Sequence, residues 1–140
     1  MSIATVLLPV FVEVALTFGL LFWAGFLRTR ELRSGRVRRE DVRLDDHAFP
    51  DKVRQVANCY GNQLQLPVLF YVVVALALFT RQADFLFVLL SWVFVITRLA
   101  HAFVHTGSND IAVRGPVFGI GGIVLAVMWA IFAVKILTGI

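Results

Sequence analysis

Four apolar runs decide what this chain can fold into. They cover residues 3–27, 66–80, 85–104 and 116–140 of the 140-residue sequence. A helix that crosses a membrane needs about 20 mostly apolar residues, so the first, third and fourth runs are each long enough. The second run has only 15 residues. It predicts a membrane-spanning helix only if that helix begins near Val53, with its first turns outside the hydrocarbon.

The composition agrees with a membrane protein. Hydrophobic residues make up 59% of the chain and charged residues 16%, against about 45–50% and about 25% in soluble domains. Helices satisfy their own backbone hydrogen bonds in lipid, where no water is available. We therefore predict an all-α fold, an integral membrane four-helix bundle that forms a single domain over residues 1–140. Its helices are expected over about 3–27, 53–80, 84–106 and 116–138, with a cytoplasmic loop over about 28–52.

Basic residues predict the orientation in the membrane. Nine of the 13 Lys and Arg residues lie between the first and second apolar runs, and short loops rich in Lys and Arg stay in the cytoplasm. Both chain termini are therefore expected on the non-cytoplasmic side of a multi-pass membrane protein. The first run has no positive segment before it and no cleavage site after it, so we expect a retained helix rather than a signal peptide. Acidic residues alternate with the basic ones in this loop, which argues against a nucleic-acid partner.

One face of the second expected helix is polar. Arg54, Asn58, Asn62 and Gln65 are spaced i, i+4, i+8 and i+11, and residues three or four apart are neighbours on a helix. This stripe must face protein or water rather than lipid. Three explanations are open: amides that join neighbouring helices, a helix start that lies above the membrane, and a binding site for a polar ligand. The third expected helix favours the binding site.

That third helix carries Arg98, His101 and His105 on one face, at i, i+3 and i+7. About four residues join it to the second helix, so the two helices are expected to run antiparallel and adjacent. The start of one and the end of the other then lie at the same cytoplasmic level. The residues expected to converge there are Arg54, Asn58, Asn62, Arg98, His101, His105 and Arg114.

Such a cleft is cationic and rich in hydrogen-bond donors. Arginine binds carboxylates through two parallel hydrogen bonds, and asparagine matches peptide-like amides. The predicted ligand is a small anion with carboxylates and peptide groups. The i, i+4 spacing of His101 and His105 also occurs in zinc sites, but no third ligand is evident, so no metal is predicted.

Two further side chains fall inside the expected spans. Glu13 lies about ten residues into the first helix, near mid-membrane at about 1.5 Å rise per residue. One interpretation is a proton or substrate contact. The favoured one is a buried partner for a basic or amide group, with Gln65 or a neighbouring subunit as the candidates. Cys59 follows Asn58 but lies off the polar face, so we interpret it as a packing residue rather than a nucleophile.

A longer motif surrounds the polar stripe. The spacing Arg54-x-x-x-Asn58 is followed by the amide-rich segment 62–65 and by Pro67-Val68-Leu69-Phe70. Together with the basic first loop and the four apolar runs, this pattern resembles the MAPEG family, the membrane-associated proteins in eicosanoid and glutathione metabolism, and in particular its bacterial branch. The resemblance runs over nearly the whole chain. It implies a homotrimer in a bacterial inner membrane, with glutathione as co-substrate held between neighbouring subunits near the cytoplasmic side.

The resemblance also implies roles for individual residues. Arg54 and Asn58 correspond to the arginine and asparagine that bind glutathione, and Gln65 stands where the family has a glutamate. A second register matches Asn62 and Gln65 to the family's asparagine and acid instead, and both registers are open. On the third helix, the family's cationic and aromatic face corresponds to Arg98, His101 and His105, with the two histidines in place of tyrosines. Arg114 is the nearest counterpart of the arginine that activates the thiol. Arg28 and Arg30 correspond to arginines that contact an anionic or electrophilic substrate.

The reaction that this resemblance implies is attack of the glutathione thiolate on a lipophilic electrophile or peroxide that enters from the bilayer. A thiol has a pKa near 8.5, and a neighbouring arginine lowers it. The implied partners are membrane lipid, further copies of the chain and a lipophilic small-molecule substrate. The alternative is a non-catalytic membrane scaffold or regulatory binding protein of the same fold. A small transporter is a third reading, weakened because no matched pair of broken helices is evident.

Overall fold

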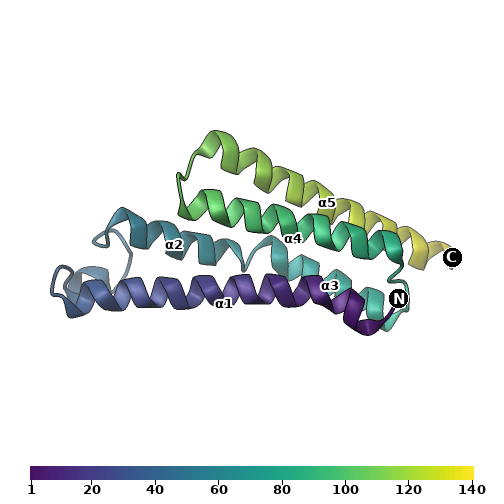
Figure 1. The fold of residues 1–140 in the computed structure, drawn as a ribbon, viewed down its shortest axis with the longest axis horizontal. Coiled ribbons are helices and arrows are strands. Elements are labelled where there is room, and N and C mark those ends of the chain that lie inside the picture. Colours follow the sequence, from purple (N-terminus) through teal and green to yellow (C-terminus); the bar gives the residue numbers. More distant parts are fainter.

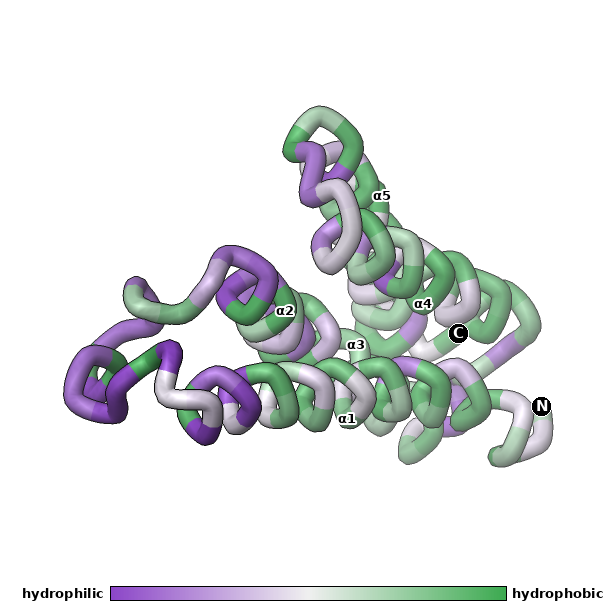
Figure 2. The backbone as a smooth tube through the Cα atoms, turned by 60° about the vertical axis from the view of Figure 1, so that its left-hand side comes forward, coloured by the Kyte–Doolittle hydropathy of each residue, from purple (hydrophilic) through white to green (hydrophobic).

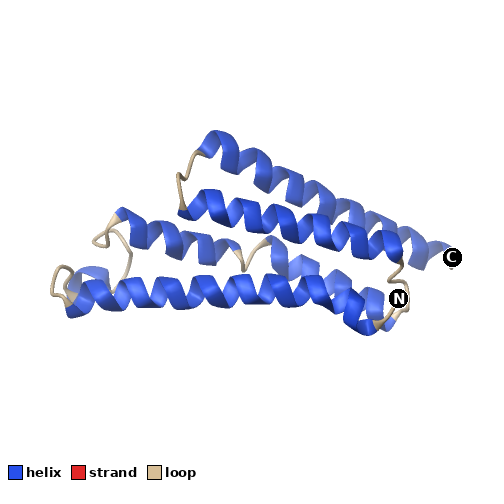
Figure 3. Cartoon of the chain, in the orientation of Figure 1, coloured by secondary structure: helices blue, strands red, loops and turns tan.

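The structure, a computed structural model, describes residues 1–140 and is built from helices (Figure 1, Figure 3). In chain order the elements are α1 (Ile3–Arg33), a short 3₁₀ helix (Arg39–Val42), α2 (Asp51–Asn62), α3 (Leu66–Phe79), α4 (Phe85–Thr106) and α5 (Ile111–Thr138). Four stretches are long and apolar enough to cross a membrane: α1, the pair α2–α3 taken together, α4 and α5. The predicted all-α four-helix membrane bundle is confirmed.

Both termini lie at one end of the bundle, and the α1–α2 loop and the α4–α5 connection lie at the other (Figure 1). Figure 2 shows hydrophilic segments gathered at this loop end and along α2. Helix α1 extends to Arg33, six residues beyond the expected end at residue 27. Arg30 and Arg33 occupy its last turn, where positive charge interacts favourably with the helix dipole. The first six residues of the expected loop, 28–33, therefore continue α1 as helix.

The second span is not the continuous helix expected over 53–80. It is divided between Asn62 and Leu66, where a tight turn forms with i→i+3 hydrogen bonds from Leu64 to Gly61 at 3.1 Å and from Gln65 to Asn62 at 3.3 Å. The break is visible between α2 and α3 (Figure 1). Pro67 explains it, because proline has no N–H to donate and its ring clashes with the carbonyl four residues earlier.

Helix α5 begins at Ile111, five residues before the expected start at residue 116. Asp110 precedes it and accepts a hydrogen bond from the Ala112 N–H at 2.9 Å, which is the role of an N-cap residue. Pro116 lies inside the helix rather than at its first position. The cap at Asp110, rather than the proline, sets the boundary, and it brings Arg114 into the first turn of α5.

The apolar core lies around α3 and α4, with α1 and α5 packed on either side. Phe70 of α3 stacks on Phe94 of α4, with ring centroids 4.7 Å apart, and Val6, Val73 and Met128 are buried around them. Large apolar side chains also cover the outside of the spans, for example Phe11, Phe18, Phe22, Phe26, Ile96, Phe103 and Ile123. These outer faces suit contact with lipid, so the chain is a multi-pass membrane protein.

Asp84 starts α4 and ties it to the end of α5. Its carboxylate accepts hydrogen bonds from the Phe87 N–H at 2.8 Å and from the Lys135 ammonium group. Both bonds lower the pKa of the Asp84 carboxyl below its usual value of 3.8, and the bond from Lys135 has the larger effect. A carboxyl with a lowered pKa in the folded state stabilises the fold above its unfolded-state pKa, and that contribution is lost as the pH falls through the folded-state value.

Replacing Asp84 with asparagine is therefore expected to lower the free energy of unfolding at pH 7 by about 0.2–1 kcal/mol, the range for exposed ion pairs. Asparagine also caps helices well. The loss in free energy of unfolding therefore measures the contribution of the Asp84 charge rather than that of the helix cap. The difference from wild type should shrink as the pH falls below 3.8. Thermal unfolding in detergent between pH 7 and pH 3 measures it, with Glu40→Gln in the exposed 3₁₀ helix as the control. A difference that stays constant over this pH range would contradict the assignment.

Candidate functional site

The polar face of α2 is fastened to the end of α4. The Gln55 side-chain amide donates to the His105 carbonyl at 2.6 Å and to the Gly107 carbonyl at 2.9 Å. The Lys52 ammonium group donates to the Thr106 carbonyl. The last carbonyls of a helix have no partner within the helix, so these two side chains supply the missing donors. The start of α2 and the end of α4 therefore meet at the loop end of the bundle, as the sequence predicts.

A polar cleft opens at this junction. It has a volume of about 420 Å³, and no hydrophobic residue lines it. The lining side chains come from α2 and from the α4–α5 connection: Asp51, Arg54, Gln55, Asn58, Ser108 and Asn109. Sites for small molecules usually have about 300–1,000 Å³, so the cleft has room for a ligand of tripeptide size.

Arg114 lies next to this cleft. Its guanidinium group donates to the side-chain oxygen of Asn109, and Asn109 adopts a left-handed backbone conformation with φ 53°, which asparagine tolerates better than most residues. Within the cleft, Arg54 makes a long ion pair of 3.7 Å with Asp51. The structure thus brings together three predicted site residues, with Arg54 and Asn58 lining the cleft and Arg114 bonded to its wall.

The other predicted residues of α2 and α4 form a separate, buried network. The Asn62 amide lies 3.2 Å from Nδ1 of His105, and Nη2 of Arg98 donates to the Asn62 carbonyl at 3.3 Å. His101 contacts His105 edge-on, with ring centroids 5.4 Å apart. The exposed fractions of Arg98 and His101 are only 1% and 2%, so these two residues lie beneath the cleft rather than in it.

Phe118 of α5 covers this network. Its ring centroid lies 5.5 Å from the Arg98 guanidinium carbon and 5.5 Å from the His101 ring centroid. A cation over an aromatic face is attracted by the negative face of the ring, which helps to hold Arg98 in an apolar setting. Asn62 and His105 connect the buried network to the polar cleft, because Gln55 of the cleft bonds the His105 carbonyl. The sequence predicts that all these residues converge in one cleft. In the structure they form two adjoining groups, the polar cleft and the buried network.

Three predicted site residues lie elsewhere in the chain. Gln65 is in the break between α2 and α3 and is exposed, since the break takes it off the α2 face. Arg28 pairs with Asp46 and lies over the Phe49 ring at 5.5 Å, which fixes the loop against α1. Arg30 lies 3.5 Å from Glu31.

A family model, the MAPEG family, matches residues 6–134. The chain belongs to the MAPEG family. The match includes most or all of each of the four spans, so the resemblance noted from the arginine–asparagine motif is confirmed at the level of the family. This family includes glutathione transferases and peroxidases as well as non-catalytic members. No curated protein and no solved structure matches the chain.

Two residues of this MAPEG chain enter the buried network in a way that sequence reasoning missed. Glu13 of α1 lies against Gln63, not against Gln65. When the Gln63 amide is oriented to satisfy both neighbours, its nitrogen donates to Glu13 Oε1 at 2.8 Å and its oxygen accepts from Arg98 Nη2 at 3.3 Å. Pro67 was the sequence feature that could have indicated this pairing. It follows Gln63 by four residues, and a proline at that spacing ends the preceding helix. The end of the helix changes which amide side chain points into the bundle.

Cys59 is fully buried and packs with Leu20 and Ala102. That position agrees with the packing role expected for it and keeps its thiol away from the polar cleft. Asn58, the preceding residue, is exposed, whereas Cys59 is buried on another side of α2. In this MAPEG chain the cleft therefore offers cationic and amide groups but no thiol of its own.

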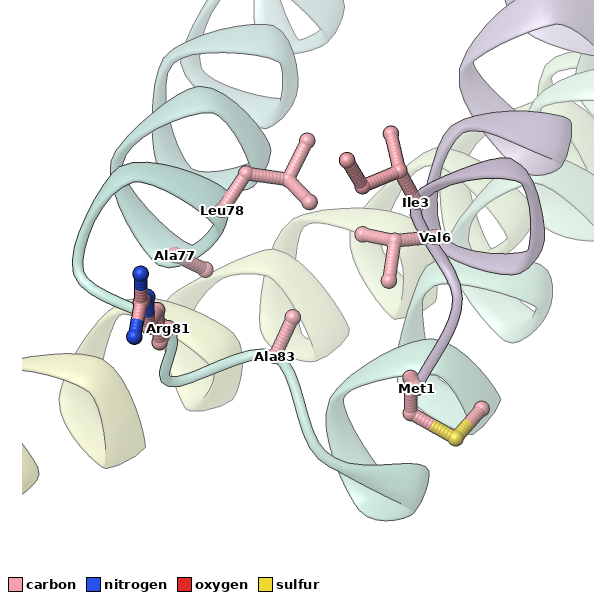
Figure 4. A pocket seen from close by; sticks show the side chains of 7 residues that line it. All are labelled: Met1, Ile3, Val6, Ala77, Leu78, Arg81 and Ala83. Atoms are coloured by element: carbon pink, nitrogen blue, oxygen red, sulfur yellow. The ribbon is translucent and has the colours of Figure 1, made fainter.

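A second hollow lies at the opposite end of the bundle, near both termini. It has a volume of about 330 Å³ and lies where the start of α1 meets the end of α3 (Figure 4). Its lining is apolar except for one arginine: Met1, Ile3, Val6, Ala77, Leu78, Arg81 and Ala83. Because no set of polar groups converges there, the α2–α4 cleft is the better candidate for the site of this MAPEG chain.

Proposed function

We propose that this MAPEG protein binds glutathione in the α2–α4 cleft and uses its thiolate to attack a lipophilic electrophile or peroxide. The observation that supports this proposal is the lining of the cleft, to which the side chains of Arg54, Asn58 and Asn109 all contribute. Glutathione has two carboxylates and two peptide groups, and arginine and asparagine are their natural partners. Asp51 adds a carboxylate that can accept from the ammonium group of the tripeptide.

Arg114 is the proposed thiol-activating residue. A positive charge near a thiol favours the thiolate, which is the nucleophile. With an electrophilic carbon, the thiolate forms a thioether bond and the leaving group departs with its electron pair. With a peroxide, the thiolate attacks one oxygen, the O–O bond breaks, and the products are an alcohol and a sulfenic acid of glutathione. A second glutathione then forms the disulfide with release of water. The second substrate would reach the cleft through the apolar outer faces of the spans, which contact lipid.

We also propose that the chain works as a homotrimer, with the loop end of the bundle in the cytoplasm. MAPEG members are typically oligomeric, and the outer faces of α1, α4 and α5 carry large exposed apolar side chains. In a trimer, Arg28 and Arg30 would reach the ligand of a neighbouring subunit. The basic α1–α2 loop supports the cytoplasmic orientation, and the mass of the detergent-extracted complex tests the trimer.

Glutathione binding by calorimetry tests the proposed site. Arg54→Ala should weaken binding at least about tenfold, because hydrogen bonds to charged groups contribute about 1.5–3 kcal/mol. Asn58→Ala should weaken it about fivefold, in line with a neutral hydrogen bond of about 1 kcal/mol. Arg39→Ala removes an exposed arginine outside the cleft and is the control. It should leave the affinity unchanged.

No heat with the wild-type protein would overturn this proposal and favour the second candidate, a non-catalytic scaffold or regulatory protein. The observation in favour of that candidate is the burial of Arg98 and His101 beneath Phe118, which withholds two of the expected ligand-binding side chains. If binding occurs, a conjugation assay with a generic aryl halide separates a transferase from a protein that only binds.

A further inference from the structure

Three buried polar side chains from different segments meet at the break in the second span. They are Glu13 of α1, Gln63 of the turn between α2 and α3, and Arg98 of α4, and their exposed fractions are 0%, 1% and 1%. We call these three residues the clamp. Glu13 is ten residues after the start of α1, which places it about 15 Å along the helix. The clamp therefore lies deep in the bundle rather than at its polar end.

The break creates a need for such a group. In an unbroken helix the Asn62 carbonyl would accept from the N–H of residue 66, but here it receives the weaker turn bond from Gln65 at 3.3 Å. Backbone groups freed within a membrane must be satisfied by neighbouring protein. Arg98 Nη2 supplies a second donor to this carbonyl at 3.3 Å. Arg98 thus holds the last residue of α2 from the side of α4.

Arg98 in turn needs a negative charge, since an unpaired ion is expensive to bury. Glu13 provides it through the Gln63 amide, which donates to the carboxylate at 2.8 Å and accepts from the guanidinium at 3.3 Å. The amide between them keeps the two charges connected without direct contact. Helix α1 is thereby joined to α4 through the very turn that separates α2 from α3.

We propose that the clamp positions α2, and with it Arg54 and Asn58, for ligand binding. This inference rests on the proposed glutathione site. The first turns of α2 are fixed to the end of α4 by the hydrogen bonds of the Gln55 side chain. The last turn of α2 is held by the clamp. None of the three clamp residues lines the cleft. Their effect on binding therefore runs through the direction of α2, and Glu13 is a positioning residue rather than a catalytic one.

Exchanging the two bridging groups tests this inference. Glu13→Gln leaves the buried Arg98 without a counter-charge, and Gln63→Glu places two carboxylates side by side. Each single variant should weaken glutathione binding about tenfold, the loss expected when a hydrogen bond to a charged group fails. The double variant Glu13→Gln/Gln63→Glu returns one carboxylate and one amide to the same bridge. It should restore affinity to within about twofold of wild type.

Calorimetry with glutathione measures affinity, and thermal unfolding in detergent is recorded for each variant. Ser91→Ala is the matched control, because Ser91 is a buried polar residue of α4 that bonds only to the Phe87 carbonyl at 2.9 Å. Its affinity for glutathione should equal that of wild type.

The outcomes separate this inference from the proposed function. If wild type binds and the single variants lower only the unfolding temperature, the clamp is structural and the inference is overturned while the glutathione site stands. A folded double variant that still binds weakly also overturns it, even where a single variant does not fold. Absence of binding by wild type overturns both proposals together.

Discussion

Replacing Arg98 with alanine is expected to lower the free energy of unfolding by up to about 3–5 kcal/mol, the range for leaving a buried charge without its counter-charge. Glu13 would then be a carboxylate with no cation nearby and an exposed fraction of 0%. The Asn62 carbonyl at the helix break would also lose its side-chain donor. Denaturant unfolding in detergent, followed by circular dichroism at constant pH, measures the change.

The control removes both charges at once. Replacing buried ion pairs with apolar side chains of similar volume is often neutral or stabilising, so Arg98→Met with Glu13→Leu should recover most of the loss. A stability loss below about 1 kcal/mol for Arg98→Ala would show that the charge at position 13 is not held by Arg98. Equal losses for the single and double variants would point to packing around Phe118 instead of charge.

If the chain catalyses the proposed glutathione conjugation, replacing Arg114 with alanine is expected to lower kcat about 100-fold or more, the usual cost of one group that stabilises charge in the transition state. The expected reason is loss of the positive charge beside the thiol, since Arg114 stands against Asn109 on the cleft wall. Affinity for glutathione should change much less, because Arg54 and Asn58 are untouched. Stopped-flow kinetics with an aryl halide separates the two effects.

Arg114→Lys is the matched variant for this prediction. It keeps the charge but not the planar fork of donors, so it should recover part of kcat. A shift of the kinetic pKa of the bound thiol toward its free value of about 8.5 should accompany the loss in Arg114→Ala. An unchanged pH profile and rate would assign thiol activation to another group.

Much of the architecture follows from residue spacing alone. Each apolar run is long enough, or nearly so, to predict its own span, and the short α3–α4 connection predicts that α2 and α4 meet at the loop end. That reasoning located Arg54 and Asn58 at a polar junction, where the structure has a cleft. These features depend on the periodicity of apolar and polar residues and on the lengths of the connections between helices. Both can be determined from a single sequence.

The interior of the site was less predictable. A stripe drawn on a continuous helix put Gln65 beside the other polar residues, and the break at Gln63–Gln65 exposes it instead. Burial of Arg98 depends on how α5 lays Phe118 over it, and no local pattern specifies that contact. The pairing of Glu13 with Gln63 required the helix break, the helix crossing and the amide orientation together. Tertiary packing, rather than periodicity, decided these three points.

Helix α3 has 14 residues and is therefore about 21 Å long, whereas the hydrocarbon of a typical bilayer is about 30 Å thick. Its neighbours α1, α4 and α5 have 31, 22 and 28 residues and have no such deficit. Helix α3 alone is therefore shorter than the hydrocarbon is thick. Only the last turns of α2, which carry amide side chains, can extend the second span across the remaining thickness. Lengthening the lipid acyl chains should draw those amides toward oil and strain the junction with α4. Ligand affinity should then vary with membrane thickness in reconstituted bilayers.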